Sequence, residues 1–136
     1  MPPVDVELPA EASSAAAARA AVRSLLAAAP RPGADPQAVD RVLLLTSEVV
    51  TNAILHARTP LRVTAELVGG RVLVRVYDSL QLLPRRRAYR ADAGTGRGMQ
   101  LVEALSDGWG VDQTSAGKSV WFAVALSAAP STVQYG

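Results

Sequence analysis

The chain contains no cysteine, and this absence excludes disulfides, thiolate metal sites and thiol nucleophiles. It contains one histidine, His56, which is therefore a poor candidate for a metal ligand. No apolar stretch approaches the roughly 20 residues that a membrane-spanning helix needs. The first residues show no basic segment followed by an apolar one, so we expect no signal peptide, no membrane contact and a cytoplasmic protein.

Positive and negative charges are nearly balanced in the chain. The formal net charge is only +2, which argues against direct binding to nucleic acid. Hydrophobic residues make up 49% of the chain and charged residues 19%, which is the composition of a folded globular protein. The 136 residues fit one domain. We expect residues 1–126 to form that domain and residues 127–136, which carry no core pattern, to form a flexible tail.

Three segments have apolar residues at helical spacing. The first covers residues 11–29. The second begins after Asp35, a good capping residue, with Pro36 in its first turn, and it runs to about residue 57. Its apolar residues cover most of the helix circumference, so we expect this helix to be largely buried. The third predicted helix covers residues 98–106.

Alternating apolar and polar residues predict strands in the rest of the chain. Gly69 and Gly70 separate two such runs and indicate a two-residue hairpin. Residues 79–93 have no periodicity, and a loop of that length is typically a lid or a binding segment. The elements predict an α+β fold, a two-layer sandwich whose mixed, mostly antiparallel sheet is covered on one face by three helices. The predicted strands cover residues 4–8 (at an edge), 61–67, 72–78, 109–113 and 118–126.

A polar stripe interrupts the second helix at Glu48, Asn52 and His56, within an arc of about 80° on an ideal helix. A solvated helix face is one explanation. The flanking residues are apolar, however, and burying an unpaired carboxylate costs free energy. The second explanation is therefore that the stripe lines a cleft that contains water or an ion. In such a cleft the Asn52 oxygen suits Mg²⁺, and Glu48 suits proton acceptance from an attacking hydroxyl. His56 could contact a phosphate or simply end the helix.

The glycine-rich segment 94–98, with the sequence GTGRG, directly precedes the third predicted helix. Glycines that leave backbone N–H groups accessible ahead of a helix can bind phosphate, and Arg97 could add a cation. A flexible connector is the alternative explanation. The segment does not fit the dinucleotide-binding fingerprint, which places its glycines between a strand and a helix of a βαβ unit.

Two further features bear on a nucleotide site. Asp78 ends a predicted strand, where a carboxylate can accept a hydrogen bond from an exocyclic amine such as adenine N6; it could also be an ordinary turn residue. An arginine cluster in the long loop could be solvated, could engage an acidic partner or could screen triphosphate charge. The cluster consists of Arg85, Arg86, Arg87 and Arg90.

Taken in order, these segments resemble the GHKL (Bergerat) ATPase superfamily, and within it the anti-sigma-factor serine kinases. The resemblance covers roughly residues 15–126. Residues 47–57 (SEVVTNAILHA) look like the N box of the family, and residues 76–78 (VYD) look like the start of its adenine-binding box. Residues 94–102 (GTGRGMQLV) look like the second glycine box, followed by 105–111 (LSDGWGV) and by 117–122 (GKSVWF) as the closing strand.

The resemblance implies a site for ATP and Mg²⁺. Glu48 would be the catalytic base, Asn52 would hold Mg²⁺, and Asp78 would accept from adenine N6. Ser119 would support the adenine through water, and the second glycine box would hold phosphate. The implied ATP-binding residues are Asn52, His56, Asp78, Gly94, Thr95, Gly96, Arg97, Gly98, Met99 and Ser119.

The resemblance also implies partners, namely a sigma factor, a STAS-type anti-anti-sigma protein and a second copy of the chain. We therefore expect an ATP-binding anti-sigma factor that phosphorylates a serine of a STAS-type antagonist. One departure leaves an alternative open, because the superfamily usually has glycine two residues after the aspartate and this chain has Leu80. The alternative is a non-catalytic module in which nucleotide binding controls transcription by partner exchange. An α+β interaction domain without a ligand is a further alternative.

Overall fold

The computed structural model describes residues 3–28, 35–79, 96–115 and 117–127. The features predicted for residues 80–95 (the lid, its arginine cluster, Gly94 and Thr95) and for the tail at 128–136 lie outside this part of the chain. The elements, in chain order, are β1 (Val4–Leu8), α1 (Ser13–Ala28), α2 (Pro36–Ala57), β2 (Leu61–Val68), β3 (Arg71–Asp78), α3 (Gly96–Leu105), β4 (Gly108–Thr114) and β5 (Gly117–Ala125).

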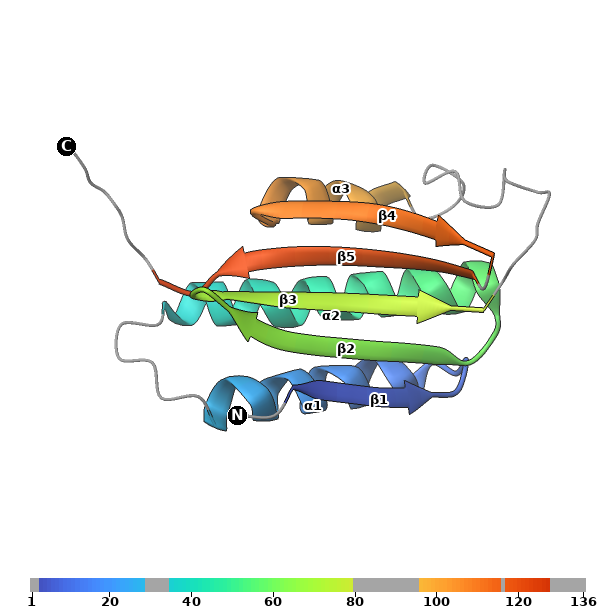
Figure 1. Ribbon diagram of the computed structural model, residues 1–136, viewed down its shortest axis with the longest axis horizontal. Helices are drawn as coiled ribbons and strands as arrows, with labels where there is room; N and C mark the ends of the chain where they lie inside the picture. Colours follow the sequence, from blue (N-terminus) through green and yellow to red (C-terminus); the bar gives the residue numbers. More distant parts are fainter. Residues whose placement is uncertain (1–2, 29–34, 80–95, 116, 128–136) are drawn as a thin grey trace.

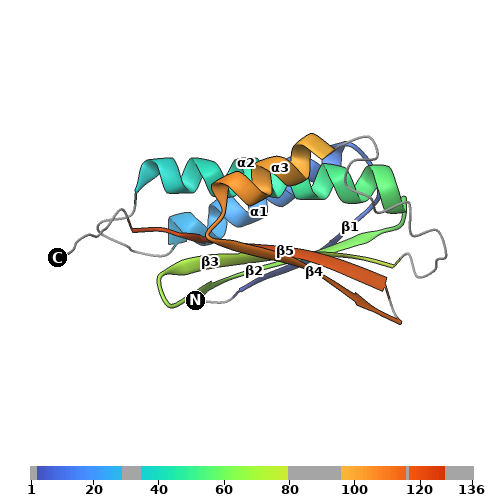
Figure 2. The ribbon, with the colours of Figure 1, turned by 90° about the horizontal axis from the view of Figure 1, so that it is seen from above.

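The strands form one sheet in the order β1-β2-β3-β5-β4, and all four neighbouring pairs are antiparallel. Figure 2 shows the three helices together on one face of this sheet. The predicted two-layer α+β fold is confirmed, and the described sheet is antiparallel throughout rather than mixed. In Figure 1 the helices lie side by side in the order α1, α2, α3, so α2 is the central helix of its layer.

Helix α2 begins where the sequence predicts. Asp35 is its N-cap, and the Asp35 Oδ1 atom accepts a 3.0 Å hydrogen bond from the backbone N–H of Gln37. Pro36 occupies the first turn, where its missing N–H has no cost. The helix ends after Ala57 because Arg58 adopts a left-handed conformation, with φ 56°. A 22-residue helix therefore runs across the centre of the sheet.

The hairpin between β2 and β3 also forms as predicted. Gly69 and Gly70 have φ values of 57° and 82°, which glycine adopts without strain and which suit a two-residue hairpin turn. The turn fixes the register, so that Leu61 lies opposite Asp78 at the other end of the pair.

Side chains on β3 and β5 alternate between the helix-covered face and the open face. Val74 and Val76 lie opposite Phe122 and Val120, and all four are buried in the core under the helices. The residues between them, such as Arg75 and Trp121, belong to the open face. Every residue of these two strands is therefore assigned to a face by its position in the register.

Helix α3 begins at Gly96, two residues before its predicted start, and ends at Leu105. Val102 is fully buried in the core, and Met99 packs against the same cluster. The chain then enters β4 through Asp107, whose Oδ2 accepts a 2.7 Å hydrogen bond from the N–H of Ala125. Among the described residues, no helix combines the length and the hydropathy needed to cross a bilayer.

Candidate functional site

The predicted polar stripe lies at the border between the buried and exposed sides of α2. Glu48, Asn52 and His56 are all half-buried. On one side of the stripe, Val49 and Ala53 are buried in the core, and on the other side Thr51 is exposed. The stripe is therefore neither a fully solvated face nor part of the core, which is the position expected for residues that line a cleft.

The contacts of Ser47 show which flank of α2 carries the stripe. Arg19 Nη1, from α1, donates a 2.6 Å hydrogen bond to Ser47 Oγ, so Ser47 lies on the flank that faces α1. Each residue advances roughly 100° around a helix. Glu48 and Asn52 therefore lie on one side of the exposed face of α2, and Ser47 lies on the other. Because α2 lies between α1 and α3, the stripe is on the flank that faces α3 (Figure 1).

The first turn of α3 lies near the same end of the molecule. Gly96, Arg97 and Gly98 form this turn, and α3 contacts α2. Figures 1 and 2 place the start of α3, the C-terminal half of α2 and the end of β3 at one end of the sandwich. The first backbone N–H groups of a helix have no intrahelical acceptor, and the helix dipole adds partial positive charge there. A negatively charged group would be stabilised at this position.

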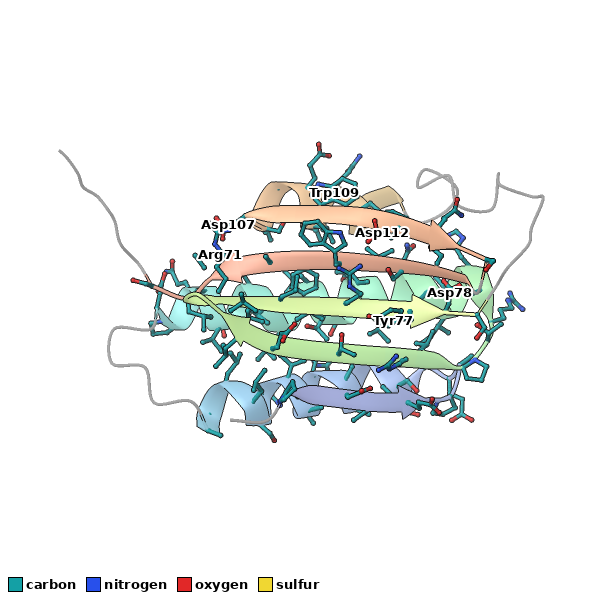
Figure 3. The ribbon with its side chains drawn as sticks, viewed as in Figure 1. Arg71, Tyr77, Asp78, Asp107, Trp109 and Asp112 are labelled. Atoms are coloured by element: carbon teal, nitrogen blue, oxygen red, sulfur yellow. The ribbon has the colours of Figure 1, made fainter. Side chains whose placement is uncertain are left out.

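Asp78 lies at the end of β3 (Figure 3), and its burial in alternation with Val74 and Val76 places its side chain on the helix-covered face. Its side chain is only 2% exposed. In the register it faces Lys118 of β5, and the Lys118 Nζ atom lies 3.9 Å from Asp78 Oδ2. Burial lowers the pKa of Lys118 from 10.5, and the charge of Asp78 opposes this shift. A carboxylate and an ammonium group therefore share the buried end of the sheet.

Ser119 and Asp78 line the same pocket at this end of the sheet, but their side chains belong to opposite faces of the sheet. Ser119 lies opposite Tyr77, on the open face, and its hydroxyl accepts a 3.1 Å hydrogen bond from Arg75 Nη1. Lys118 is not among the site residues predicted from the sequence, although the alternation of side chains along the strand could have identified it. Residues two apart share a face, so Lys118 belongs with the core residues Val120 and Phe122.

Gly117 holds the two strand ends close together. Its φ is 146°, and a Cβ built at this position would lie 2.1 Å from the carbonyl oxygen of Asp78. No other residue type fits there without moving the backbone. This close approach fixes the backbone position of Lys118 relative to Asp78.

A pocket of about 320 Å³ opens at the same end of the sheet and is lined in part by open-face residues. Its lining includes Asp78 and Lys118 as well as the open-face residues Arg62, Tyr77 and Asp112. Arg62 donates to both oxygens of Asp5 at 2.9 and 2.8 Å and lies over the ring of Tyr77, and Arg75 bonds Asp112 at 2.8 Å. Arg62 and Arg75 are therefore paired with carboxylates at the open face, while Lys118 lines the pocket from the helix-covered side of the sheet.

The described residues contain no cluster of three or more His, Cys, Asp or Glu side chains that could hold a metal by themselves. The stripe instead offers a carboxamide and a carboxylate, which are oxygen ligands. This donor set fits Mg²⁺, an ion that keeps several waters and is bound mainly by the phosphates of its nucleotide. Asn52 is the residue that would hold it.

The described residues form three helices on a five-stranded antiparallel sheet, which is the architecture of the GHKL (Bergerat) fold. Residues 8–124 match the histidine kinase-like ATPase domain family. The chain belongs to this family, and membership in a family of ATPase domains implies that it binds ATP. No curated protein matches the chain.

Solved structures agree with this assignment. The RsbU and RsbW domains of Rv1364c from Mycobacterium tuberculosis match with a TM-score of 0.69 and 26% identity, over 93% of this chain and 32% of that one. The blue-light activated histidine kinase of Erythrobacter litoralis EL346 matches with a TM-score of 0.57 and 23% identity, over 81% of this chain and 42% of that one. The chain thus spans about a third and two fifths of these two proteins, and the second likeness concerns the fold alone.

Proposed function

We propose that the chain is an anti-sigma factor that binds Mg²⁺-ATP and transfers the γ-phosphoryl group to a serine of a STAS-type antagonist. The observation that carries this proposal is the position of Glu48 and Asn52 on the flank of α2 that faces α3. The similarity to a structure that contains an RsbW domain, together with the motif resemblance, supports the regulatory role.

The nucleotide would span the end of the sandwich. Asp78 would accept a hydrogen bond from the exocyclic amine of the base, since a carboxylate is an acceptor only. The triphosphate would extend toward the first turn of α3, where the N–H groups and the helix dipole favour anions. Asn52 would hold Mg²⁺, which neutralises phosphate charge when it is bound. His56, one turn further along α2, would lie beside the nucleotide.

Glu48 would serve as the base for the transfer. A serine hydroxyl oxygen forms a bond to the γ-phosphorus while the bond from that phosphorus to the β,γ-bridging oxygen breaks, and ADP leaves. The serine proton passes to the Glu48 carboxylate. Such a reaction depends on positioning and charge neutralisation more than on covalent chemistry by the protein. The protein would act in the cytoplasm, as a dimer, and would release or hold a sigma factor according to the state of the antagonist.

A phosphotransfer assay tests this proposal. The protein is incubated with Mg²⁺, labelled ATP and STAS-domain proteins encoded near its gene. Glu48→Gln should lower the transfer rate by about 10²–10⁴-fold, the usual contribution of a general base, while ATP binding persists. Glu66→Gln, an exposed change on β2, is the matched control. Undiminished transfer by Glu48→Gln would contradict the role of this base.

A second candidate is a non-catalytic module in which ATP binding alone governs partner exchange. It is favoured by the segment after Asp78, which lacks the glycine usual in the superfamily and in which the Ser79 N–H is held by Thr59 Oγ1 at 3.2 Å. This candidate predicts saturable ATP binding that Asn52→Ala abolishes, with no phosphate moving to any partner.

A further inference from the structure

The pairing of Asp78 with Lys118 has a consequence for which bases the site accepts. The two residues face each other in the register of β3 and β5, on the helix-covered face. The Asp78 side chain is 2% exposed and the Lys118 side chain 7%. Their closest charged atoms are 3.9 Å apart, which is an ion-pair distance rather than that of a direct hydrogen bond.

An aspartate and a lysine offer complementary hydrogen-bonding groups. An ionised carboxylate only accepts, and an ammonium group only donates, with three N–H groups that rotate together. A ligand edge that contacts both must present a donor next to an acceptor. Adenine does so with its N6 amino group beside N1. Guanine does so in the opposite order, with O6 beside the N1–H group.

A carboxylate alone would discriminate between these two bases. Where adenine presents its amino group, guanine presents the O6 oxygen, and two acceptors facing each other in a buried site repel. Lys118 changes this balance, because its ammonium group can donate to O6 while Asp78 accepts from N1–H. The low exposure of both side chains strengthens these charged contacts relative to contacts in water.

The backbone makes the pairing a fixed feature of the fold. Gly117 brings the start of β5 against the carbonyl of Asp78 more closely than any other residue type permits. Lys118 follows directly in the strand, so its side chain emerges on the same face as Asp78. Replacing a buried ion pair by apolar residues is often neutral or stabilising, so stability alone does not explain why this pair is present.

We propose that Lys118 widens the base specificity of the nucleotide site, so that it accepts guanine and other 6-oxopurine nucleotides as well as adenine nucleotides. This inference rests on the proposed nucleotide site and adds to it a specificity-determining residue. Affinity for GTP should lie within about tenfold of the affinity for ATP, a difference of roughly 1.4 kcal/mol or less.

Calorimetric titration of the full chain with the Mg²⁺ complexes of ATP, GTP and ITP tests the proposal. ITP has O6 and N1–H but no 2-amino group, so it isolates the contact with O6. Lys118→Met should lower the affinities for GTP and ITP at least tenfold more than the affinity for ATP. Lys118→Arg, which keeps a cationic donor, should preserve binding of all three nucleotides. Glu66→Gln, an exposed change near the hairpin end of β2, should leave the selectivity unchanged.

The outcomes separate this inference from the proposed function. If wild-type protein binds ATP but prefers it to GTP by clearly more than about tenfold, the specificity proposal is wrong and the ATP site stands. Equal losses for all three nucleotides in Lys118→Met would overturn it as well. If no purine nucleotide binds, the proposed function fails, and the specificity proposal fails with it. The wild-type ratio needs no variant, so a Lys118→Met protein that fails to fold does not prevent the test.

Discussion

Arg19 Nη1 donates a 2.6 Å hydrogen bond to Ser47 Oγ, and this contact joins α1 to one flank of the central helix α2. Glu48 follows Ser47 in the chain but lies roughly 100° further around the helix. By this helical step the polar stripe lies on the flank away from α1, and α3 is the helix that lies on that side of α2 (Figure 1). The proposed nucleotide site depends on this division of α2, with a packed flank on one side and a polar flank on the other.

Replacement of Asn52 by alanine should weaken binding of Mg²⁺-ATP. Loss of a contact to a charged group typically costs about 1.5–3 kcal/mol, so we expect a decrease in affinity of roughly 10- to 100-fold. Thermal-shift titration measures the change, because ligand binding to the folded state raises the melting temperature. Thr51→Ala, at the adjacent exposed position, is the control and should bind normally. Equal affinities of the two variants for Mg²⁺-ATP would show that Asn52 does not contribute to the site.

Gly117→Ala should destabilise the fold strongly. The added Cβ would lie 2.1 Å from the Asp78 carbonyl oxygen, and the backbone has a φ of 146° that alanine rarely adopts. We expect the free energy of unfolding to fall by about 2–4 kcal/mol, measured by urea denaturation. Gly108→Ala is the matched control, because its Cβ would meet nothing closer than 3.8 Å. A loss of equal size in both variants would contradict the role assigned to Gly117.

Local patterns account for most of the fold. The Asp35-Pro36 pair predicts the start of α2, and the Gly69-Gly70 pair predicts the turn between β2 and β3. Helix α3 begins two residues before the start that its apolar pattern predicts. Gly96 and Gly98 have poor helix propensity, and packing of the helix against α2 outweighs that local preference.

Asp35→Ala should lower the free energy of unfolding by about 1 kcal/mol, the usual contribution of an N-cap. The carboxylate accepts from Gln37 N–H at 3.0 Å, and alanine offers no acceptor for this group. Chemical denaturation compares this variant with Asp40→Ala, an exposed change further along the same helix. We expect Asp40→Ala to remain within about 0.5 kcal/mol of wild type. If Asp35→Ala were as stable as the wild type, the Asp35 side chain would contribute nothing to the free energy of unfolding, and water would satisfy the Gln37 N–H group equally well.

Lys118 should make stability rise with pH on the alkaline side. Burial lowers its pKa below 10.5, so between the lowered value and 10.5 the unfolded chain carries a proton that the folded chain has lost. In that window the unfolded state binds more protons, and the free energy of unfolding therefore increases with pH. Denaturation curves from neutral pH to about pH 10 should show a smaller increase for Lys118→Met than for wild type. Identical pH dependence of the two proteins would contradict this prediction.

The site was harder to predict than the fold, because it depends on which face each strand residue occupies. The sequence places Ser119 and Lys118 side by side, and only the register of β5 against β3 shows that Lys118 shares a face with Asp78. The polar stripe on α2 was recognisable from its spacing alone. Which neighbouring helix it faces follows from the order of the helices over the sheet, a long-range property that no local pattern encodes.

The most direct test of the nucleotide site is an amide chemical-shift titration of the isotope-labelled protein with Mg²⁺-ATP. We predict that the largest shifts occur at the backbone amides of Gly96 and Gly98, at the side-chain amide of Asn52 and at the amide of Asp78. Shifts confined to the open face of the sheet, around Arg62 and Tyr77, or no shifts at saturating ATP, would contradict a nucleotide site between α2 and α3.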